Sequence, residues 1–187
     1  MRPSTRARRV ATARTVPCAH VTYTVRPARP GDAAAIARIY NDGIDDRNAT
    51  FETEPRTAAD VEGWLDAGYP LVVAEANDRS VAGWASAPPY RPARAAYAGV
   101  ADFSIYVARE RRGHGVGRLL LVGLVEESER RGLWKLVSRV FPENDASLAL
   151  CRALGFREVG VYRRHARLDG EWRDVVIVER LLGEAAV

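Results

Sequence analysis

The chain has 187 residues, of which 47% are hydrophobic and 28% charged, the composition of one globular domain of ordinary size. No stretch reaches about 18 apolar residues without a charge, which excludes a membrane span, and Cys18 and Cys151 are too few for a disulfide scaffold. The formal net charge of +4 arises in residues 1–20, which hold five arginines and no acid, so the rest of the chain is not a basic nucleic-acid-binding surface.

Residues 1–20 are expected to form a disordered, arginine-rich extension. The segment has no apolar run and so is not a secretory signal, whereas translation from an upstream start codon, a transit peptide and a DNA-binding arm stay open as alternatives. Residues 21–183 contain no repeat or low-complexity linker and are expected to form one domain, followed by a tail over 184–187. The low cysteine content predicts a reducing, cytoplasmic location.

The first half of the chain predicts a strand, two helices and a hairpin. Asp32 and Thr57 are typical residues at the start of helices, and Asn77-Asp78 predicts the turn of a hairpin. From the apolar patterns we expect a strand over residues 21–26, a helix over 33–42, a second helix after Thr57, and strands over 71–74 and 81–87.

The second half predicts strands that alternate with helices. Gly132 and Gly155 suit the left-handed residue that ends a helix, and prolines around Tyr90 interrupt regular structure. We expect strands over residues 100–107 and 134–140, helices over 118–131 and 144–154, and two final strands over 158–167 and 175–182 joined by a turn. This order predicts a mixed α/β fold around one sheet.

A glycine-rich loop between a predicted strand and a predicted helix is the most informative segment. It reads Arg111-Arg112-Gly113-His114-Gly115-Val116-Gly117-Arg118. Glycines let successive backbone N–H groups turn toward one point, and a helix N-terminus adds about half a positive charge. Together these features predict a site for an anion such as a pyrophosphate, with a tight turn that binds nothing as the alternative.

Two common nucleotide-binding motifs do not fit this loop. The Walker loop requires Lys-Ser or Lys-Thr after its last glycine, where this chain has Arg118-Leu119. The dinucleotide fingerprint G-x-G-x-x-G requires a third glycine at position 118 or 120, and those positions hold arginine and leucine. The pattern that remains is Arg112-x-x-Gly115-x-Gly117.

That pattern, with Asn144 and the sequence Ala153-Leu154-Gly155-Phe156 after it, resembles the GCN5-related N-acetyltransferases (GNAT) over nearly all of residues 21–183. The resemblance implies a central mixed, mostly antiparallel sheet flanked by helices and split between its two central strands for acetyl-CoA. It implies no metal, and no histidine or cysteine here has a metal-ligand spacing. It assigns to the coenzyme Tyr106, Val107, Arg112, Gly113, His114, Gly115, Val116, Gly117, Arg118, Asn144 and Ser147, with capping of a helix as a second role for Asn144.

Finer features resemble the phosphinothricin N-acetyltransferase branch of that family. This branch implies acetylation of the α-amino group of a small anionic amino acid, with relatives acting on methionine sulfone, methionine sulfoximine or arsinothricin, and a role in antibiotic or herbicide resistance. The segments that carry the resemblance are Ile39-Tyr40-Asn41, Phe51-Glu52-Thr53-Glu54-Pro55, Ala101-Asp102-Phe103-Ser104-Ile105, residues 138–144 and Gly170-Glu171-Trp172-Arg173-Asp174-Val175.

Three residues are candidates for the chemistry. An amino acid arrives as an ammonium ion, so a base must remove a proton before the nitrogen attacks the thioester. Asp102 matches a strand glutamate of the branch and is the expected base, with an ion pair to an arginine as the alternative. The family implies a backbone N–H near Val107 as the oxyanion donor. Cys151 stands where family members place a Tyr or His acid, and core packing is its alternative role.

A substrate with carboxylate and other oxyanion groups suits planar arginine side chains. In the proline-interrupted loop, Arg91 and Arg94 are expected to bind it beside Tyr90 and Tyr97. Arg94 and Tyr97 match a substrate-side pair of the branch, although this loop is one residue longer, which leaves specificity open.

Two further residues are expected at the substrate. Arg139 lies among apolar residues on a central strand, so it is expected to meet Asp102 or Glu143, or to face the substrate. Phe51 is expected to form a lid or wall over the substrate, with plain packing as the alternative.

The expected partners are a small-molecule amino acid and a second copy of the chain, with no nucleic acid and no membrane. By family analogy, the aliphatic residues 175–178 are the expected surface of a homodimer. Two other functions stay open: acetylation of another amine, such as a peptide N-terminus or a polyamine, and binding of acetyl-CoA by a sensor without turnover.

Overall fold

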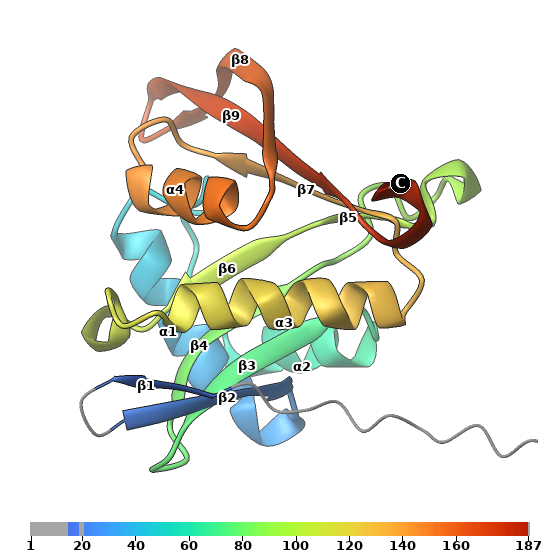
Figure 1. Ribbon diagram of the computed structural model, residues 1–187. Helices are drawn as coiled ribbons and strands as arrows, with labels where there is room; N and C mark the ends of the chain where they lie inside the picture. Colours follow the sequence, from blue (N-terminus) through green and yellow to red (C-terminus); the bar gives the residue numbers. More distant parts are fainter. Residues whose placement is uncertain (1–14, 19–20, 187) are drawn as a thin grey trace, which may run out of the picture.

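The computed structural model describes residues 15–18 and 21–186, which form two β-sheets flanked by helices (Figure 1). The first sheet is antiparallel throughout and has the strand order β1-β2-β3-β4-β6. Its strands are β1 (Thr15–Cys18), β2 (Val21–Pro27), β3 (Leu71–Ala76), β4 (Val81–Ser86) and β6 (Ser104–Val107).

Strand β1 lies inside the segment for which the sequence predicts disorder. Its four residues pair with β2, from Thr15 opposite Thr24 to Cys18 opposite Val21, so disorder is the wrong prediction for them. Thr15 and Val16 are β-branched and favour an extended backbone, and the neighbouring strand supplies the hydrogen bonds. The other residues of the expected extension, 1–14 and 19–20, lie outside the described part of the chain.

The second sheet has the order β5-β7-β9-β8 and is mixed, because β5 runs parallel to β7 while the other pairs are antiparallel. The predicted strand 100–107 is thus divided between the sheets, and the predicted single sheet is two sheets. Phe103 marks the division: its N–H donates to the Val137 carbonyl at 2.8 Å, and its buried ring contacts Phe156. The strands are β5 (Val100–Asp102), β7 (Lys135–Val140), β8 (Arg157–Leu168) and β9 (Glu171–Leu181).

Helices cover the first sheet on both faces. Helices α1 (Ala33–Asp45) and α2 (Ala58–Asp66) bury their apolar sides against Val73 and Trp84 on the far face in Figure 1. Helix α3 (Val116–Arg130) packs on the near face, and α4 (Asp145–Ala153) lies above its N-terminal half and covers the second sheet.

Three ends of these helices carry the residues that the sequence predicts there, whereas the start of α1 does not. The Thr57 hydroxyl accepts a hydrogen bond from the Asp60 N–H, and Gly132 and Gly155 have φ values of +79° and +77° just after α3 and α4. Asp32 does not cap α1 with its side chain; its carboxylate instead accepts the Arg29 N–H and pairs with Arg26.

Strand β9 is the centre of the apolar packing in the second sheet, not a free surface. Val176 and Val178 are buried in the core that α3 and α4 share, and Val175 is buried with Phe141 and Leu168, so residues 175–178 are the wrong prediction for a dimer surface. The large apolar residues that are exposed on this hairpin are Val159, Val161, Tyr162, Trp172 and Leu181. None of the helices formed by residues 21–186 is long and apolar enough to cross a membrane.

Candidate active site

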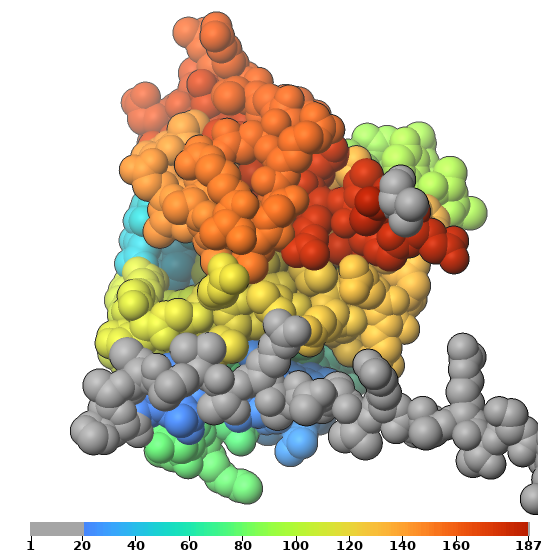
Figure 2. All heavy atoms as spheres, in the orientation of Figure 1, coloured from blue at the N-terminus to red at the C-terminus, as the bar shows by residue number. Residues whose placement is uncertain are grey.

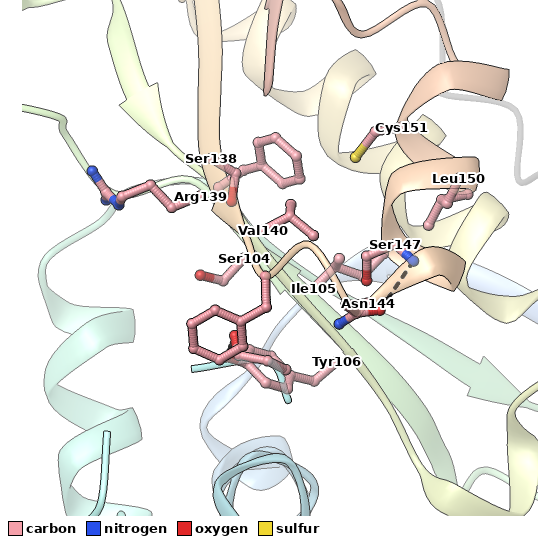
Figure 3. Close-up of a pocket in the computed structure, with 13 residues that line it drawn as sticks. Ser104, Ile105, Tyr106, Ser138, Arg139, Val140, Asn144, Ser147, Leu150 and Cys151 are labelled. Carbon is pink, nitrogen blue, oxygen red and sulfur yellow. Dashed lines mark hydrogen bonds between the residues drawn. The ribbon is translucent and has the colours of Figure 1, made fainter. Parts of the chain in front are cut away.

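The two sheets separate where β5 becomes β6, and this separation opens a cavity. Asp102 still pairs with Val137, but beyond Phe103 strand β6 follows β4 while β7 follows β9. The cavity of about 70 Å³ lies between them (Figure 3). Its lining is Ala49, Phe103, Ser104, Ile105, Tyr106, Ser138, Arg139, Val140, Phe141, Asn144, Ser147, Leu150 and Cys151.

Hydrogen bonding between β4 and β6 leaves alternate peptide groups of β6 facing this opening. The Ala108 N–H donates to the Ala82 carbonyl at 2.9 Å, and Val107 is opposite Gly83 in the next pair. In an antiparallel ladder such pairs alternate, so the N–H and C=O groups of Val107 and Ile105 point away from β4. The Val107 N–H therefore faces the space between the sheets, as expected of a donor to an oxyanion.

The glycine-rich loop forms an open ring of donors at the start of α3. Gly113 and Gly115 have φ values of +77° and +78°, and α3 begins at Val116, two residues earlier than predicted. In the described chain, no backbone carbonyl accepts the N–H groups from Gly113 to Arg118. These donors and the helix N-terminus fit the two phosphates of a pyrophosphate. In Figure 2 this part of the chain (yellow) borders α4 (orange) on the viewed face.

The Arg112 side chain turns away from this ring of donors. Its Nε donates to the Val107 carbonyl at 3.2 Å, and its Nη2 lies 2.7 Å from Asp46. Partial burial opposes ionisation of Asp46, but hydrogen bonds from Arg109 and Arg112 outweigh it and lower the pKa of the carboxyl. The His114 Nδ1 contacts the Arg112 carbonyl at 2.8 Å. The loop therefore presents backbone N–H groups to an anion, while the Arg112 and His114 side chains contact the protein and stabilise the loop.

Asn144 has both ends of its amide engaged. Its Oδ1 accepts the Ser147 N–H at 3.1 Å, which caps α4, and its Nδ2 donates to the Asn48 carbonyl at 3.0 Å (Figure 3). The capping role left open by the sequence is therefore present. On the opposite wall, the buried Tyr106 donates its hydroxyl to the Ala49 carbonyl at 3.4 Å, and burial raises its pKa.

Cys151 lines the cavity from α4 but belongs to the apolar core. Its side chain is buried beside Leu148 and Phe156, and burial raises the pKa of the thiol to about 11. A thiol that holds its proton this strongly is a poor acid toward a departing thiolate, so the geometry favours packing.

Asp102 and Arg139 form an ion pair at the edge of the opening. The Arg139 Nη2 donates to the Asp102 Oδ1 at 2.8 Å, while Glu143 pairs with Arg173 instead. The Arg139 side chain is 41% exposed, so it keeps contact with solvent on its strand. Burial raises the pKa of Asp102, and the charge and hydrogen bond of Arg139 act in the opposite direction.

A second hollow of about 280 Å³ lies on the face of the second sheet that none of the α-helices within residues 21–186 covers, and Ser138 and Arg139 line both this hollow and the cavity. We call it the outer hollow. The Arg91 guanidinium lies 5.2 Å and 5.3 Å from the Tyr90 and Tyr97 ring centres at its rim. Its lining is Tyr90, Tyr97, Val100, Asp102, Lys135, Val137, Ser138, Arg139, Val159, Ile177 and Glu179.

Three expected substrate residues stand outside this lining, namely Arg91, Arg94 and Phe51. Arg94 is exposed on the loop, and Phe51 packs edge-to-face on Phe141 with ring centres 4.8 Å apart. Conversely, sequence analysis misses Lys135 and Glu179. The signal for Lys135 is its two-residue spacing from Val137 and Arg139, which places it on their face of β7.

This combination of a split between sheets, a donor-rich loop and a helix at its edge defines a coenzyme-A-dependent acyltransferase fold. The family model of the Acetyltransferase (GNAT) family matches residues 35–156, and the chain belongs to this family. It is an acetyl-CoA-dependent N-acetyltransferase, related to the phosphinothricin and methionine sulfoximine acetyltransferases.

Individual relatives support this branch. The chain is 32% identical to the L-methionine sulfoximine/L-methionine sulfone acetyltransferase of Pseudomonas paraeruginosa over 85% of this chain and 94% of that one. It is 35% identical to the phosphinothricin N-acetyltransferase of Streptomyces coelicolor over 84% and 95%. The phosphinothricin acetyltransferase of Sinorhizobium meliloti in complex with acetyl-CoA superposes with a TM-score of 0.81, at 33% identity over 87% and 89%.

The donor set of the site fits acetyl-CoA and offers nothing to a metal. The unpaired N–H groups of residues 113–118 suit the pyrophosphate, and the cavity between β6 and β7 suits the acetylated arm. Across residues 21–186, no group of three or more His, Cys, Asp or Glu side chains is placed to hold a metal ion.

Proposed function

We propose that this enzyme acetylates the α-amino group of a small amino acid whose side chain carries a tetrahedral oxyacid or sulfone-type group. One observation carries the proposal: the carboxylate of Asp102 and the guanidinium of Arg139 lie together where the cavity between the sheets meets the outer hollow. An α-amino acid has its ammonium and carboxylate groups two bonds apart. It therefore meets a base and an arginine at one point.

The reaction is direct attack in a ternary complex. Asp102 accepts a proton from the substrate ammonium, directly or through a water, and the freed nitrogen attacks the thioester carbonyl carbon. The Val107 N–H stabilises the negative oxygen of the tetrahedral intermediate. The C–S bond then breaks, the amide forms, and the coenzyme A thiolate leaves. Because that thiolate is a tolerable leaving group, the reaction does not need Cys151 as an acid.

The coenzyme is held mainly by main-chain groups. Its pyrophosphate binds the N–H groups of residues 113–118 at the start of α3, and its pantetheine arm runs between β6 and β7 toward Asp102. Ser147 and Tyr106 line this path. Acetyl-CoA supplies the acetyl group.

The substrate side is the outer hollow, which is lined by charged side chains of both signs and by two tyrosines. Arg139 binds the α-carboxylate, and Tyr90 and Tyr97 form one wall, with Arg91 stacked on their rings at the rim. Arg94 and Phe51, which stand apart from the lining, take positions at the rim.

The enzyme is further proposed to be a cytoplasmic homodimer, since acetyl-CoA is a metabolite of the cell interior. The exposed apolar residues of the β8–β9 hairpin, Val161, Tyr162 and Trp172, support a dimer contact there.

The test is release of free coenzyme A thiol from acetyl-CoA with a panel of amines. Phosphinothricin, arsinothricin, methionine sulfone and methionine sulfoximine are expected to be turned over, and ordinary amino acids, a peptide amine and a polyamine are the comparison. Selective turnover of the peptide or the polyamine would replace the proposed substrate class. Binding of acetyl-CoA with no turnover of any amine would indicate a sensor.

A further inference from the structure

The chain contains a single lysine, Lys135, and its side chain lines the outer hollow. Lys135 is the first residue of β7 and lies opposite Val100 on β5, on the face of the sheet that also carries Val137 and Arg139. Lys135 has no part in the proposed reaction.

The surroundings of Lys135 carry an excess of positive charge. Its ammonium pairs with Glu179, which also pairs with Arg157, so two cations share one carboxylate. Hydrogen bonds from Lys135 and Arg157 outweigh the desolvation of Glu179 and lower the pKa of its carboxyl, so it stays ionised at neutral pH. A lysine ammonium has three N–H donors, and the bond to Glu179 leaves donors for a ligand in the hollow.

The other cations near the hollow are less suited to a buried oxyanion. Arg139 pairs with Asp102 and is already assigned to the substrate α-carboxylate, and Arg91 lies over two tyrosine rings on an exposed loop. The Lys135 side chain is 29% exposed and that of Glu179 is 13% exposed, so this pair lies deeper than the rim.

The spacing between Asp102 and Lys135 matches the length of an amino acid of the proposed class. Asp102 is opposite Val137, and Lys135 lies two residues earlier on the same face of β7, about 7 Å along the strand. In an extended amino acid with an oxyacid group on Cγ, four bonds of about 1.5 Å separate the α-nitrogen from the central atom of that group. A substrate whose amine lies at Asp102 therefore extends its oxyacid oxygens toward Lys135.

We propose that Lys135, held by Glu179, binds the oxyanion on the substrate side chain, and that the enzyme thereby selects anionic phosphinate or arsonate groups over neutral sulfones and sulfoximines. This inference rests on the proposed function, because it assumes an amine at Asp102. Its physical basis is that a charge-assisted hydrogen bond is about twice as strong as a neutral one. Lys135 is thus a specificity-determining residue.

The experiment measures equilibrium binding of phosphinothricin and of L-methionine sulfone to the full-length protein saturated with coenzyme A. Lys135→Met is expected to weaken phosphinothricin binding roughly tenfold to a hundredfold and to change methionine sulfone binding by less than about threefold. Arg157→Met is the matched control, because it removes the same charge from the other side of Glu179, where the side chain is 68% exposed. It is expected to change both affinities by less than about threefold, and thermal unfolding checks that both variants fold.

Each other outcome has a definite reading. An equal loss for both ligands in Lys135→Met, an unchanged phosphinothricin affinity, or an equal effect of Arg157→Met overturns the role of Lys135. If phosphinothricin binds through Lys135 but is not acetylated, the proposed function fails and the oxyanion site stands. If neither ligand binds the native enzyme, both proposals are overturned.

Discussion

Asp102 is under two opposing influences, and their balance fits a general base. Partial burial favours its neutral form, while Arg139 at 2.8 Å favours the carboxylate. Burial prevails and raises the pKa, so the carboxylate is a stronger proton acceptor than an aspartate in water. The Arg139 side chain is solvated, so removal of the Asp102 carboxylate does not leave a buried, unpaired charge.

Asp102→Asn is expected to lower kcat by roughly two or more orders of magnitude, because the amide cannot accept the ammonium proton. Asp102 acts as the carboxylate, so the native kcat/KM should fall as the pH drops through a pKa raised above 3.8, and the variant should lose this acidic limb. Rate against pH, with circular dichroism to check folding, measures both effects. Asp102→Glu serves as control and should retain part of the activity. An unaltered rate and profile in Asp102→Asn would remove this residue from the mechanism.

The sequence predicts on which side of a strand a residue lies better than it predicts which residue it pairs with. The two-residue period correctly separates Tyr106, which packs in the core with α1 and α2, from Phe103 and Ile105, which pack in the core with α3. The choice of Arg139 partner depends on the register between β5 and β7, which are more than thirty residues apart in the chain. No local pattern encodes that register.

The start of α3 is the element on which coenzyme binding depends. The loop backbone is left-handed at Gly113 and Gly115, a conformation that side chains with a Cβ rarely adopt. Gly117 lies close to α4, since a Cβ there would be in van der Waals contact with Leu150 at 3.4 Å. The glycines at 113 and 115 thus serve the loop turn, and Gly117 lies where α3 contacts α4.

Gly115→Trp is expected to abolish coenzyme A binding, because the indole would cover the N–H groups and the backbone would lose its φ of +78°. Titration calorimetry with acetyl-CoA measures the loss. The control is Gly132→Trp at the other end of α3, which has a φ of +79° and no atom within 4 Å of an added Cβ. It carries the same backbone strain and should keep coenzyme affinity. Unchanged affinity in Gly115→Trp would refute the pyrophosphate site.

Helices and their ends are predicted better than the division of strands. Both left-handed stops and the Thr57 cap depend on a few adjacent residues, and each occurs at its predicted position. The break at Phe103 leaves no local signal, because it arises when consecutive residues hydrogen-bond to different partners, β7 and β4. The start of α3 moves to Val116 for a related reason: Gly115 serves as its N-cap.

For the molecule as a whole, the proposed dimer contact follows from the large side chains that are exposed on the β8–β9 hairpin. Tyr162 is 56% exposed and Trp172 50%, on strands whose other residues supply Val175 and Val178 to the core. The sequence predicts aliphatic residues in β9 but not that both faces of the strand are covered there, since this depends on residues distant in the chain that pack on the sheet.

Light scattering is expected to give twice the mass of one chain, and Tyr162→Arg is expected to give one chain, because a charge would be buried at the proposed contact. Leu181→Arg is the control: Leu181 is 45% exposed at the end of β9 and should leave the dimer intact. A native protein with the mass of a single chain would remove the hairpin as a dimer surface.

The division of one extended segment between two sheets also bears on how the molecule unfolds. Residues 100–107 contribute β5 to the second sheet and β6 to the first, with only Phe103 between them. Loss of either sheet frees a segment on which the other depends, and exposes the buried ring of Phe103 as well. The two sheets are therefore one cooperative unit, and the strand that opens the active site is also the strand that couples their unfolding.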